Sequence, residues 1–178
     1  MAKSQKSNMF NLHRQTVVLS NFNPRSEKHG DKNVPASDLK FTMIVPNTML
    51  DCFEVGLRAA LYRKELSGEM PPSDLADQGT APADGLVKAK FGSIKGFDID
   101  KDYPGYRLGV FYGIADTPPI ELDECLLHKV HIDFKDGGSV YITLTVTCKP
   151  TKLQVAEFYE MQRAEMTINL TAPDNEAA

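Results

Sequence analysis

The stretch from Leu126 to Cys148 constrains the fold more than any other part of the chain. Apolar positions alternate with polar ones on both sides of Asp136-Gly137-Gly138. A period of two is typical of a strand with one buried face, and glycines tolerate the positive φ angles of a tight turn. The sequence therefore predicts a long antiparallel hairpin whose buried row is Leu126, His128, Val130, Ile132 and Phe134 on one arm and Val140, Ile142, Leu144, Val146 and Cys148 on the other.

The rest of the chain holds shorter patterns of the same kind. Strands are expected at residues 16–19, 39–45, 87–91, 106–114 and 166–170. Apolar residues at three- and four-residue spacing predict an amphipathic helix over 48–63, with Asn47 as its N-cap. A second helix follows Pro150, because Thr151 and Gln154 fit a capping box. Its inward side chains are expected to be Leu153, Val155, Ala156, Phe158 and Tyr159.

These elements lack the regular β-α alternation of a doubly wound parallel sheet. The expected fold class is therefore α+β, with a largely antiparallel, curved sheet of six or seven strands and two packed helices. A partly open barrel of the oligonucleotide-binding type is one arrangement compatible with this pattern, and others remain open.

The expected domain organisation is a flexible polar arm at 1–10, a single α+β domain over 11–171 and a mobile tail at 172–178. Residues 21–36 contain Asn23-Pro24, Gly30-Asp31 and Val34-Pro35, which predict a mildly basic loop. Residues 67–84 hold three prolines and four acids, and predict an exposed acidic loop longer than most connections.

Composition limits the class of protein. The chain has 178 residues and a net charge of −4, whereas domains that coat duplex DNA are usually strongly basic. Its three cysteines, Cys52, Cys125 and Cys148, form no C-x-x-C pair and are expected to be reduced thiols in the core. There is no signal peptide and no apolar run long enough to span a membrane. We therefore expect a cytoplasmic protein with no membrane partner.

Catalytic signatures are missing from the sequence. It contains no G-x-S-x-G elbow, no H-E-x-x-H pair and no glycine-rich phosphate loop. On a regular strand, His128 and His131 would project to opposite faces and could not share a metal ion. Asp98, Asp100 and Asp102 lack the glycine and glutamate that complete a calcium loop. We expect no enzyme, no metal site and no cofactor.

The segment from Leu86 to Ile114 is the candidate nucleic-acid site. It carries six of the fifteen aromatic residues of the chain, interleaved with lysine and arginine. Single strands are bound by aromatic stacking platforms and by cations that contact phosphates. The expected platforms are Phe91, Phe97 and Tyr106, and the expected phosphate contacts are Lys88, Lys90, Lys95 and Arg107. The same rings would also serve as core residues in a chain without tryptophan.

A protein-binding inhibitor or adaptor is the alternative from a different class. The acidic segment 67–84 and the acidic tail would then be its recognition surfaces. Acidic proteins of this size can block basic sites on a partner, although acids and bases alternate along most of this chain.

About half of the chain resembles uncharacterised proteins encoded by tailed bacteriophages and prophages. The resemblance rests on Asn23 to Asp31, Val34 to Lys40, the turn Asp136-Gly137-Gly138 and the run Cys148-Lys149-Pro150. It implies an accessory protein of phage DNA metabolism or host takeover, expressed in a bacterial cytoplasm, and it assigns no functional residue. Together, these observations favour a non-enzymatic protein that binds single-stranded nucleic acid, with a host defence or replication protein as the alternative target.

Overall fold

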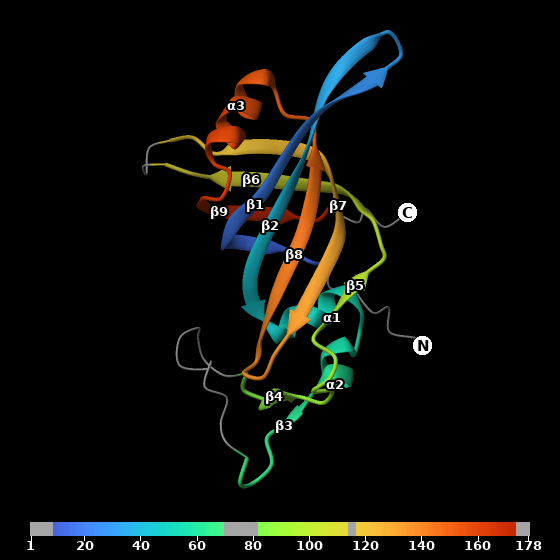
Figure 1. The fold of residues 1–178 in the computed structure, drawn as a ribbon, viewed down its shortest axis with the longest axis vertical. Coiled ribbons are helices and arrows are strands. Elements are labelled where there is room, and N and C mark those ends of the chain that lie inside the picture. The colour runs from blue at the N-terminus through green and yellow to red at the C-terminus, as the bar shows by residue number, and fades with distance from the viewer. Residues whose placement is uncertain (1–8, 70–81, 114–116, 174–178) are drawn as a thin grey trace, which may run out of the picture. The chain divides into compact units, whose positions relative to one another are not determined.

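The computed structural model describes residues 9–69, 82–113 and 117–173 (Figure 1). These residues form two compact units. The helical unit comprises Ile44–Phe97, Ile132–Tyr141 and the segment that ends at Phe10, and the barrel unit comprises Asn11–Met43, Asp98–His131 and the chain from Ile142 onward. Three long strands contribute residues to both units.

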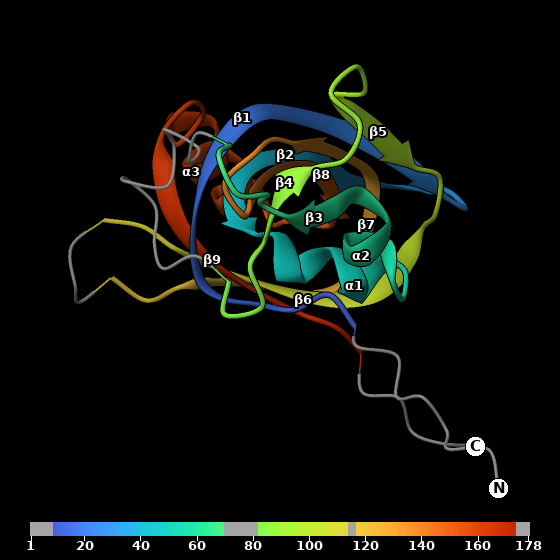
Figure 2. The ribbon, with the colours of Figure 1, turned by 90° about the horizontal axis from the view of Figure 1, so that it is seen from below.

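Six strands form a closed antiparallel barrel. They are β1 (Leu12–His29), β2 (Lys32–Pro46), β6 (Tyr103–Phe111), β7 (Ile120–Phe134), β8 (Ser139–Cys148) and β9 (Glu165–Thr171). Their order is β7-β6-β9-β1-β2-β8, and the pairing of β7 with β8 closes the ring. The short strand β5 (Gly96–Ile99) is added beside β7. Figure 2 shows the barrel strands curving around a common interior. The prediction of an α+β, largely antiparallel and curved sheet is confirmed.

The predicted hairpin is present as β7 and β8, joined by a turn at residues 135–138. On β8, the expected apolar row from Val140 to Cys148 is buried along its whole length. On β7, Val130, Ile132 and Phe134 are buried as expected. The prediction is wrong for Leu126 and His128, which are half-buried, because Leu127 enters the core in their place.

Two β-bulges explain this shift along β7. Glu124 and Lys129 have φ angles of +52° and +50°, which interrupt regular alternation. Tyr106 pairs with Cys125 and Leu108 pairs with Leu122, so an advance of two residues along β6 corresponds to three residues along β7. A bulge adds one residue to one strand, reverses the inward and outward sets beyond it, and bends the strand. Bulges of this kind allow a sheet to curve into a closed barrel.

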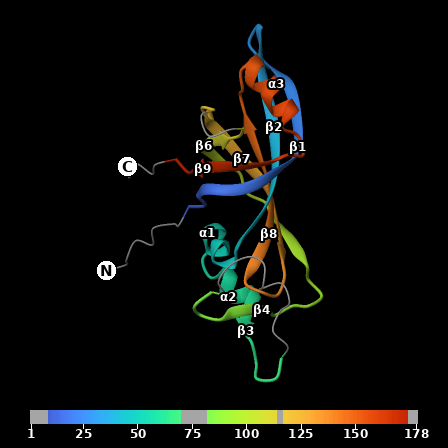
Figure 3. The same ribbon diagram turned by 90° about the vertical axis from the view of Figure 1, so that its left-hand side faces the viewer.

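The segment predicted as a loop at 21–36 is instead the end of a two-stranded ribbon. β1 and β2 pair from Asn21↔Lys40 to His29↔Lys32, and Gly30-Asp31 makes the turn. Figures 1 and 3 show this ribbon extending past the other strands of the barrel unit. The loop prediction fails because Pro24 and Pro35 lie on the two strands of an isolated ribbon, where proline is tolerated.

The helix expected over 48–63 is broken into three short elements in the helical unit. They are η1 (Asn47–Met49), α1 (Leu50–Phe53) and α2 (Leu57–Leu61), followed by strands β3 (Tyr62–Lys64) and β4 (Leu86–Ala89). Glu54, the C-cap of α1, is extended, and Gly56, the N-cap of α2, has a φ of +82°, so the backbone leaves the helical conformation between the two helices. Asn47 is not an N-cap but a buried residue, whose Nδ2 donates to the Leu86 carbonyl and whose Oδ1 accepts from Arg58 Nε.

The last helix begins as predicted but faces a different way. α3 (Lys152–Glu160) has a complete capping box, in which Gln154 N donates to Thr151 Oγ1 and Thr151 N donates to Gln154 Oε1. Phe158 is buried and packs against Phe22 of β1 with ring centroids 5.8 Å apart. Leu153 and Tyr159 are 72% and 70% exposed, and Ala156 is exposed as well, so the expectation that these three face inward is wrong. One large ring is enough to anchor a helix of nine residues to the barrel.

Two of the three cysteines lie in the core as expected, whereas Cys52 is only half-buried. Cys52, Cys125 and Cys148 are free, and the last two are buried in the barrel. Burial raises the pKa of the Cys125 thiol to about 12 and that of Cys148 further still. These thiols are therefore protonated packing groups at neutral pH.

Three other expectations involve segments at the edge of the described chain. Most of the acidic segment 67–84 and most of the tail 172–178 lie outside the described residues. Phe10, at the end of the predicted polar arm, is buried and stacks on Phe53 at 4.7 Å. No helix in the described ranges has the length and apolar character needed to cross a lipid bilayer. The prediction of a single domain over 11–171 stays a prediction.

Candidate nucleic-acid interface

The seven residues predicted to bind nucleic acid are divided between the two units. Lys88, Lys90, Phe91, Lys95 and Phe97 belong to the helical unit, and Tyr106 and Arg107 belong to the barrel unit.

In the helical unit, the predicted lysines differ in their surroundings. Lys88 Nζ lies 2.6 Å from Asp136 Oδ2, and this hydrogen bond raises the pKa of the lysine. Lys90 Nζ donates to the Ala59 carbonyl oxygen at 2.5 Å. Lys95 is exposed. Two of these three lysines thus already have partners within the chain.

The predicted aromatic platforms are mostly packing residues. Phe97 lies against Phe134 with centroids 6.0 Å apart, and only Phe91 is substantially exposed, at 46%. Tyr106 is 1% exposed, so its assignment as a stacking platform is wrong. The ring belongs to the inward row of β6 with Leu108 and Val110, and it contributes core volume in a chain without tryptophan.

Arg107 lies on the outer face of β6 and is paired with an acid. Its Nε is 2.6 Å from Asp123 Oδ1, and both side chains are about two-thirds exposed, at 70% and 67%. An ion pair this open to water is weak and can exchange its partner. The residue is accessible to a phosphate, but its neighbour Tyr106 is not accessible to a base.

A different surface of the barrel unit has the properties of a polar binding site. A groove of about 460 Å³ lies over the outer residues of β1, β2, β7 and β8, with Asp98 of β5 at its edge. We call it the barrel groove. Its lining residues are amides, hydroxyls, two lysines, one histidine and two acids: Asn21, Asn23, Asp38, Lys40, Asp98, Lys129, His131, Thr143 and Thr145.

The strand geometry brings these side chains together. Thr143 and Thr145 alternate with the buried residues Ile142, Leu144 and Val146 on β8. Asn21 pairs in register with Lys40, and Asn23 pairs with Asp38 across β1 and β2. The Lys129 bulge places His131 on the outer face of β7. Its sequence neighbours Val130 and Ile132 are buried.

A hydrogen-bonded row crosses four strands beside the groove. Arg25 of β1 forms an ion pair with Asp38 of β2, and Thr147 Oγ1 of β8 donates to Asp38 Oδ1 at 2.6 Å. His128 Nε2 of β7 is 2.8 Å from the same hydroxyl oxygen. Because the hydroxyl hydrogen is directed to the carboxylate, His128 must donate from Nε2. The row fixes the relative positions of the four strands that carry the groove.

Protonation in this row follows from its surroundings. Burial alone would raise the pKa of Asp38, but the hydrogen bonds from Arg25 and Thr147 outweigh it, and the net pKa is lowered. Burial, together with the charge of Lys129, lowers the pKa of His128. At neutral pH, Asp38 is therefore ionised and His128 is neutral.

We expect Asp38→Asn to lower the free energy of unfolding at pH 7, and the loss to shrink in acid. The folded pKa of Asp38 lies below its unfolded value of about 3.9. Its stabilising contribution is therefore complete above that value and is lost as the pH falls through the folded pKa. Urea unfolding of the wild type and the variant between neutral and acidic pH measures the difference.

The matched control is Asp31→Asn at the exposed turn of the β1–β2 ribbon, which should leave stability nearly unchanged at every pH. A difference between wild type and Asp38→Asn that stays constant down to pH ~3 would contradict the role given to the Arg25–Asp38–Thr147 contacts.

The acids of the groove are engaged, whereas its lysines are not. Asp38 is paired with Arg25, and Asp98 Oδ1 is 2.7 Å from His131 Nδ1. Lys40 and Lys129 are exposed, and within the described part of the chain neither forms an ion pair. Two ammonium groups beside neutral amides and hydroxyls can bind an anionic, hydrogen-bonding ligand.

The two histidines of β7 do not project to opposite faces as the sequence predicted. The sequence argument placed them on opposite faces, but the Lys129 bulge turns both to the outside of the barrel. They still have separate partners, Thr147 and Asp98. In the described ranges, no group of three histidine, cysteine, aspartate or glutamate side chains is placed to hold a metal ion.

None of the seven predicted residues lines the barrel groove. The sequence contained part of the signal for this groove, because Thr143 and Thr145 belong to the polar row of the predicted hairpin. The other half of the groove was hidden because residues 21–36 read as a loop, and because the bulge at Lys129 cannot be seen without its partner strand.

Comparison with known proteins gives no assignment: no protein-family model, no curated protein and no solved structure matches the chain. The class defined by the fold and the groove is a closed antiparallel β-barrel with a polar, lysine-bearing outer face.

Proposed function

We propose that this is a non-enzymatic protein that binds single-stranded nucleic acid in the barrel groove. The observation that carries the proposal is the pair of exposed lysines, Lys40 and Lys129, in a groove where Asp38 is paired with Arg25 and Asp98 is hydrogen-bonded to His131. Lysine ammonium groups contact phosphates, and the amides of Asn21 and Asn23 with the hydroxyl of Thr143 can hydrogen-bond sugars and base edges.

The architecture supports this ligand class by analogy. Small antiparallel Greek-key barrels of the oligonucleotide-binding type use an outer strand face for single strands. In this protein, the consecutive strands β6, β7 and β8 lie side by side in the sheet, and the next strand, β9, returns to pair with β6. This is a Greek-key arrangement. The barrel differs from the five-stranded type in having six strands and a complete ring.

The composition of the groove determines the expected mode of binding. Its lining contains no phenylalanine, tyrosine or tryptophan, and its single imidazole, His131, is hydrogen-bonded to Asp98, so stacking would contribute little and phosphate contacts would dominate. We therefore expect low sequence preference and marked salt dependence. The resemblance to phage proteins supports a role in phage DNA metabolism, in the cytoplasm of a bacterial host.

We expect Lys40→Gln and Lys129→Gln each to weaken binding of a labelled single-stranded oligonucleotide. For single strands, each phosphate contact contributes about −0.7 to the slope of log K against log salt, so the double variant should flatten the slope by about 1.4. Fluorescence anisotropy at a series of salt concentrations measures both quantities. Lys64→Gln with Lys152→Gln, two exposed lysines that do not line the groove, is the charge-matched control.

The same assay tests the nucleic-acid site that the sequence predicted in the segment 86–112. If Lys90→Gln and Arg107→Gln reduce the salt slope while Lys40→Gln and Lys129→Gln do not, the ligand lies over the segment 86–112 and the groove assignment is wrong. If the wild type does not bind at low salt, where attraction is strongest, the nucleic-acid proposal itself fails.

A further inference from the structure

A second cavity of the barrel unit lies between α3, the end of β6 and the start of β9. It has a volume of about 380 Å³ and is lined by Tyr112, Gly113, Glu157, Glu160, Met161, Ala164, Glu165 and Met166. We call it the α3 pocket. Its lining shares no residue with the barrel groove, so substitutions in one site leave the lining of the other unchanged.

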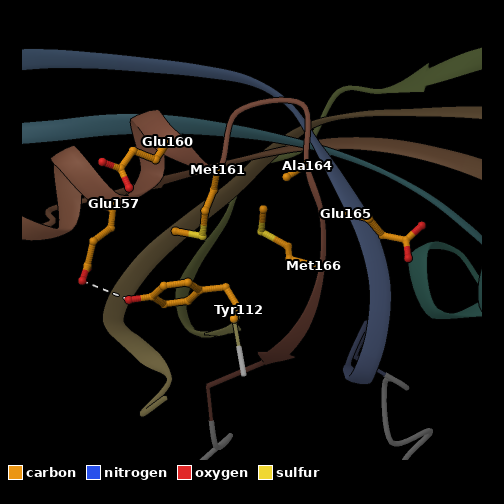
Figure 4. Close-up of a pocket in the computed structure, with 8 residues that line it drawn as sticks. Tyr112, Glu157, Glu160, Met161, Ala164, Glu165 and Met166 are labelled. Atoms are coloured by element: carbon orange, nitrogen blue, oxygen red, sulfur yellow. Dashed lines mark hydrogen bonds between the residues drawn. The ribbon is translucent and has the colours of Figure 1, made fainter. Parts of the chain in front are cut away.

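The floor of the α3 pocket is apolar. Figure 4 shows the thioether side chains of Met161 and Met166 converging above the ring of Tyr112. Both methionines are buried, at 8% and 5% exposure. Unbranched, polarisable thioethers adapt to flexible apolar groups, and methionine is common on surfaces that bind peptides.

One wall of the pocket is acidic. Glu157 and Glu160 extend from α3, and Tyr112 OH donates to Glu157 Oε1 at 2.9 Å, which fixes that carboxylate beside the pocket (Figure 4). Neither glutamate has a lysine or arginine partner among the residues that the structure describes. Glu165 points away from the methionines in the same view.

The acidic wall continues into an exposed apolar side chain. Leu153, Glu157 and Glu160 are spaced by four and three residues, so they share one face of α3. Leu153 is 72% exposed. The surface thus combines an apolar floor, two carboxylates and an apolar edge along about 10 Å of helix.

We propose that the α3 pocket binds an arginine or lysine side chain from a basic, apolar-flanked segment of a partner protein. Charge complementarity selects a cation, and the apolar floor accommodates the methylene stem that a bare metal ion lacks. A flanking apolar residue of the partner covers Leu153. The protein therefore has a protein-binding surface in addition to its proposed nucleic-acid groove.

The test uses a short fluorescein-labelled peptide in which arginine and leucine alternate with serine, and a matched peptide with glutamate in place of arginine. Anisotropy titrations compare the wild type with the double variant Glu157→Gln, Glu160→Gln. We expect the arginine peptide to bind the wild type and to bind the double variant about tenfold more weakly, and we expect the glutamate peptide not to bind.

The charge-matched control is Glu54→Gln with Glu121→Gln, two exposed acids that do not line the pocket. It should bind the arginine peptide like the wild type, and Leu153→Ser should weaken binding without a change in net charge. Equal weakening in the control and pocket variants would show attraction to the acidic chain as a whole and would overturn the proposal. Wild-type affinity in the pocket variant would also overturn it.

The two proposed binding sites can be tested separately. Lys40→Gln with Lys129→Gln should leave peptide binding unchanged, and the pocket variant should retain oligonucleotide binding with an unchanged salt slope. Loss of oligonucleotide binding in the pocket variant would mean that the α3 pocket is part of the nucleic-acid site, which would contradict a separate protein-binding role.

Discussion

Tyr106→Ala is expected to lower the free energy of unfolding by about 3–5 kcal/mol, as large aromatic truncations in protein cores do. Tyr106 is 1% exposed and lies in the barrel opposite Cys125 in the register of β6 and β7. Removing the ring leaves a cavity that close-packed neighbours fill only in part. For a chain with a typical stability of about 5–15 kcal/mol, this loss is a large fraction of the total. Urea unfolding followed by circular dichroism measures it.

The matched comparison is Phe91→Ala, which truncates another of the predicted stacking rings. Phe91 is 46% exposed, so the loss should be about 1 kcal/mol. If Tyr106→Ala does not fold, Tyr106→Leu keeps most of the volume and should remain folded with a smaller loss. Equal, small losses for Tyr106→Ala and Phe91→Ala would show that Tyr106 is not a core residue.

Gly138→Ala is expected to destabilise the helical unit by about 2–5 kcal/mol. Gly138 has a φ of +83°, a conformation that costs an L-residue about 1–2 kcal/mol. An added Cβ would also lie 2.7 Å from Pro82 Cδ and 3.1 Å from Pro82 Cγ. The proline ring cannot rotate away, so the contact adds an overpacking cost of about 1–3 kcal/mol.

Backbone hydrogen bonds prevent the turn from moving to relieve this contact. Gly137 N donates to the Val87 carbonyl at 2.8 Å, and the Gly138 carbonyl accepts from Asn47 N at 2.8 Å. The turn is therefore held against both β4 and the start of η1.

Gly30→Ala separates the two costs of the substitution. Gly30 has a φ of +61°, and a Cβ there would meet no atom of the described residues within 4 Å. It should lose only the conformational part, about 1–2 kcal/mol. Urea unfolding of both variants gives the comparison. If Gly138→Ala is no more destabilising than Gly30→Ala, the close approach to Pro82 does not constrain the turn.

Local chemistry was sufficient to predict several elements from the sequence. The hairpin of β7 and β8 follows from alternation on both sides of a glycine turn, and the capping box of α3 follows from Thr151 and Gln154. The absence of β-α alternation was enough to predict an antiparallel α+β fold. Each of these signals is contained within a few neighbouring residues.

Other features depended on strand partners far away in sequence. The bulges at Glu124 and Lys129 exist only relative to neighbouring strands, and they decided which residues of β7 face the core. The sequence left Tyr106 open between a stacking platform and a core residue, and only the closed barrel shows that its row with Leu108 and Val110 faces inward. Residues 21–36 pair as a ribbon despite two prolines, which local turn chemistry could not predict.

The barrel groove could not be found in any one stretch of sequence. The Thr147–Asp38 hydrogen bond joins residues 109 positions apart, and the lining of the groove comes from strands near both ends of the chain. The sequence by itself determined the hairpin of β7 and β8 and the inward and outward alternation of β8. Only the tertiary structure decided which outward side chains became neighbours, because closing the barrel joins distant strands and bulges reset their faces.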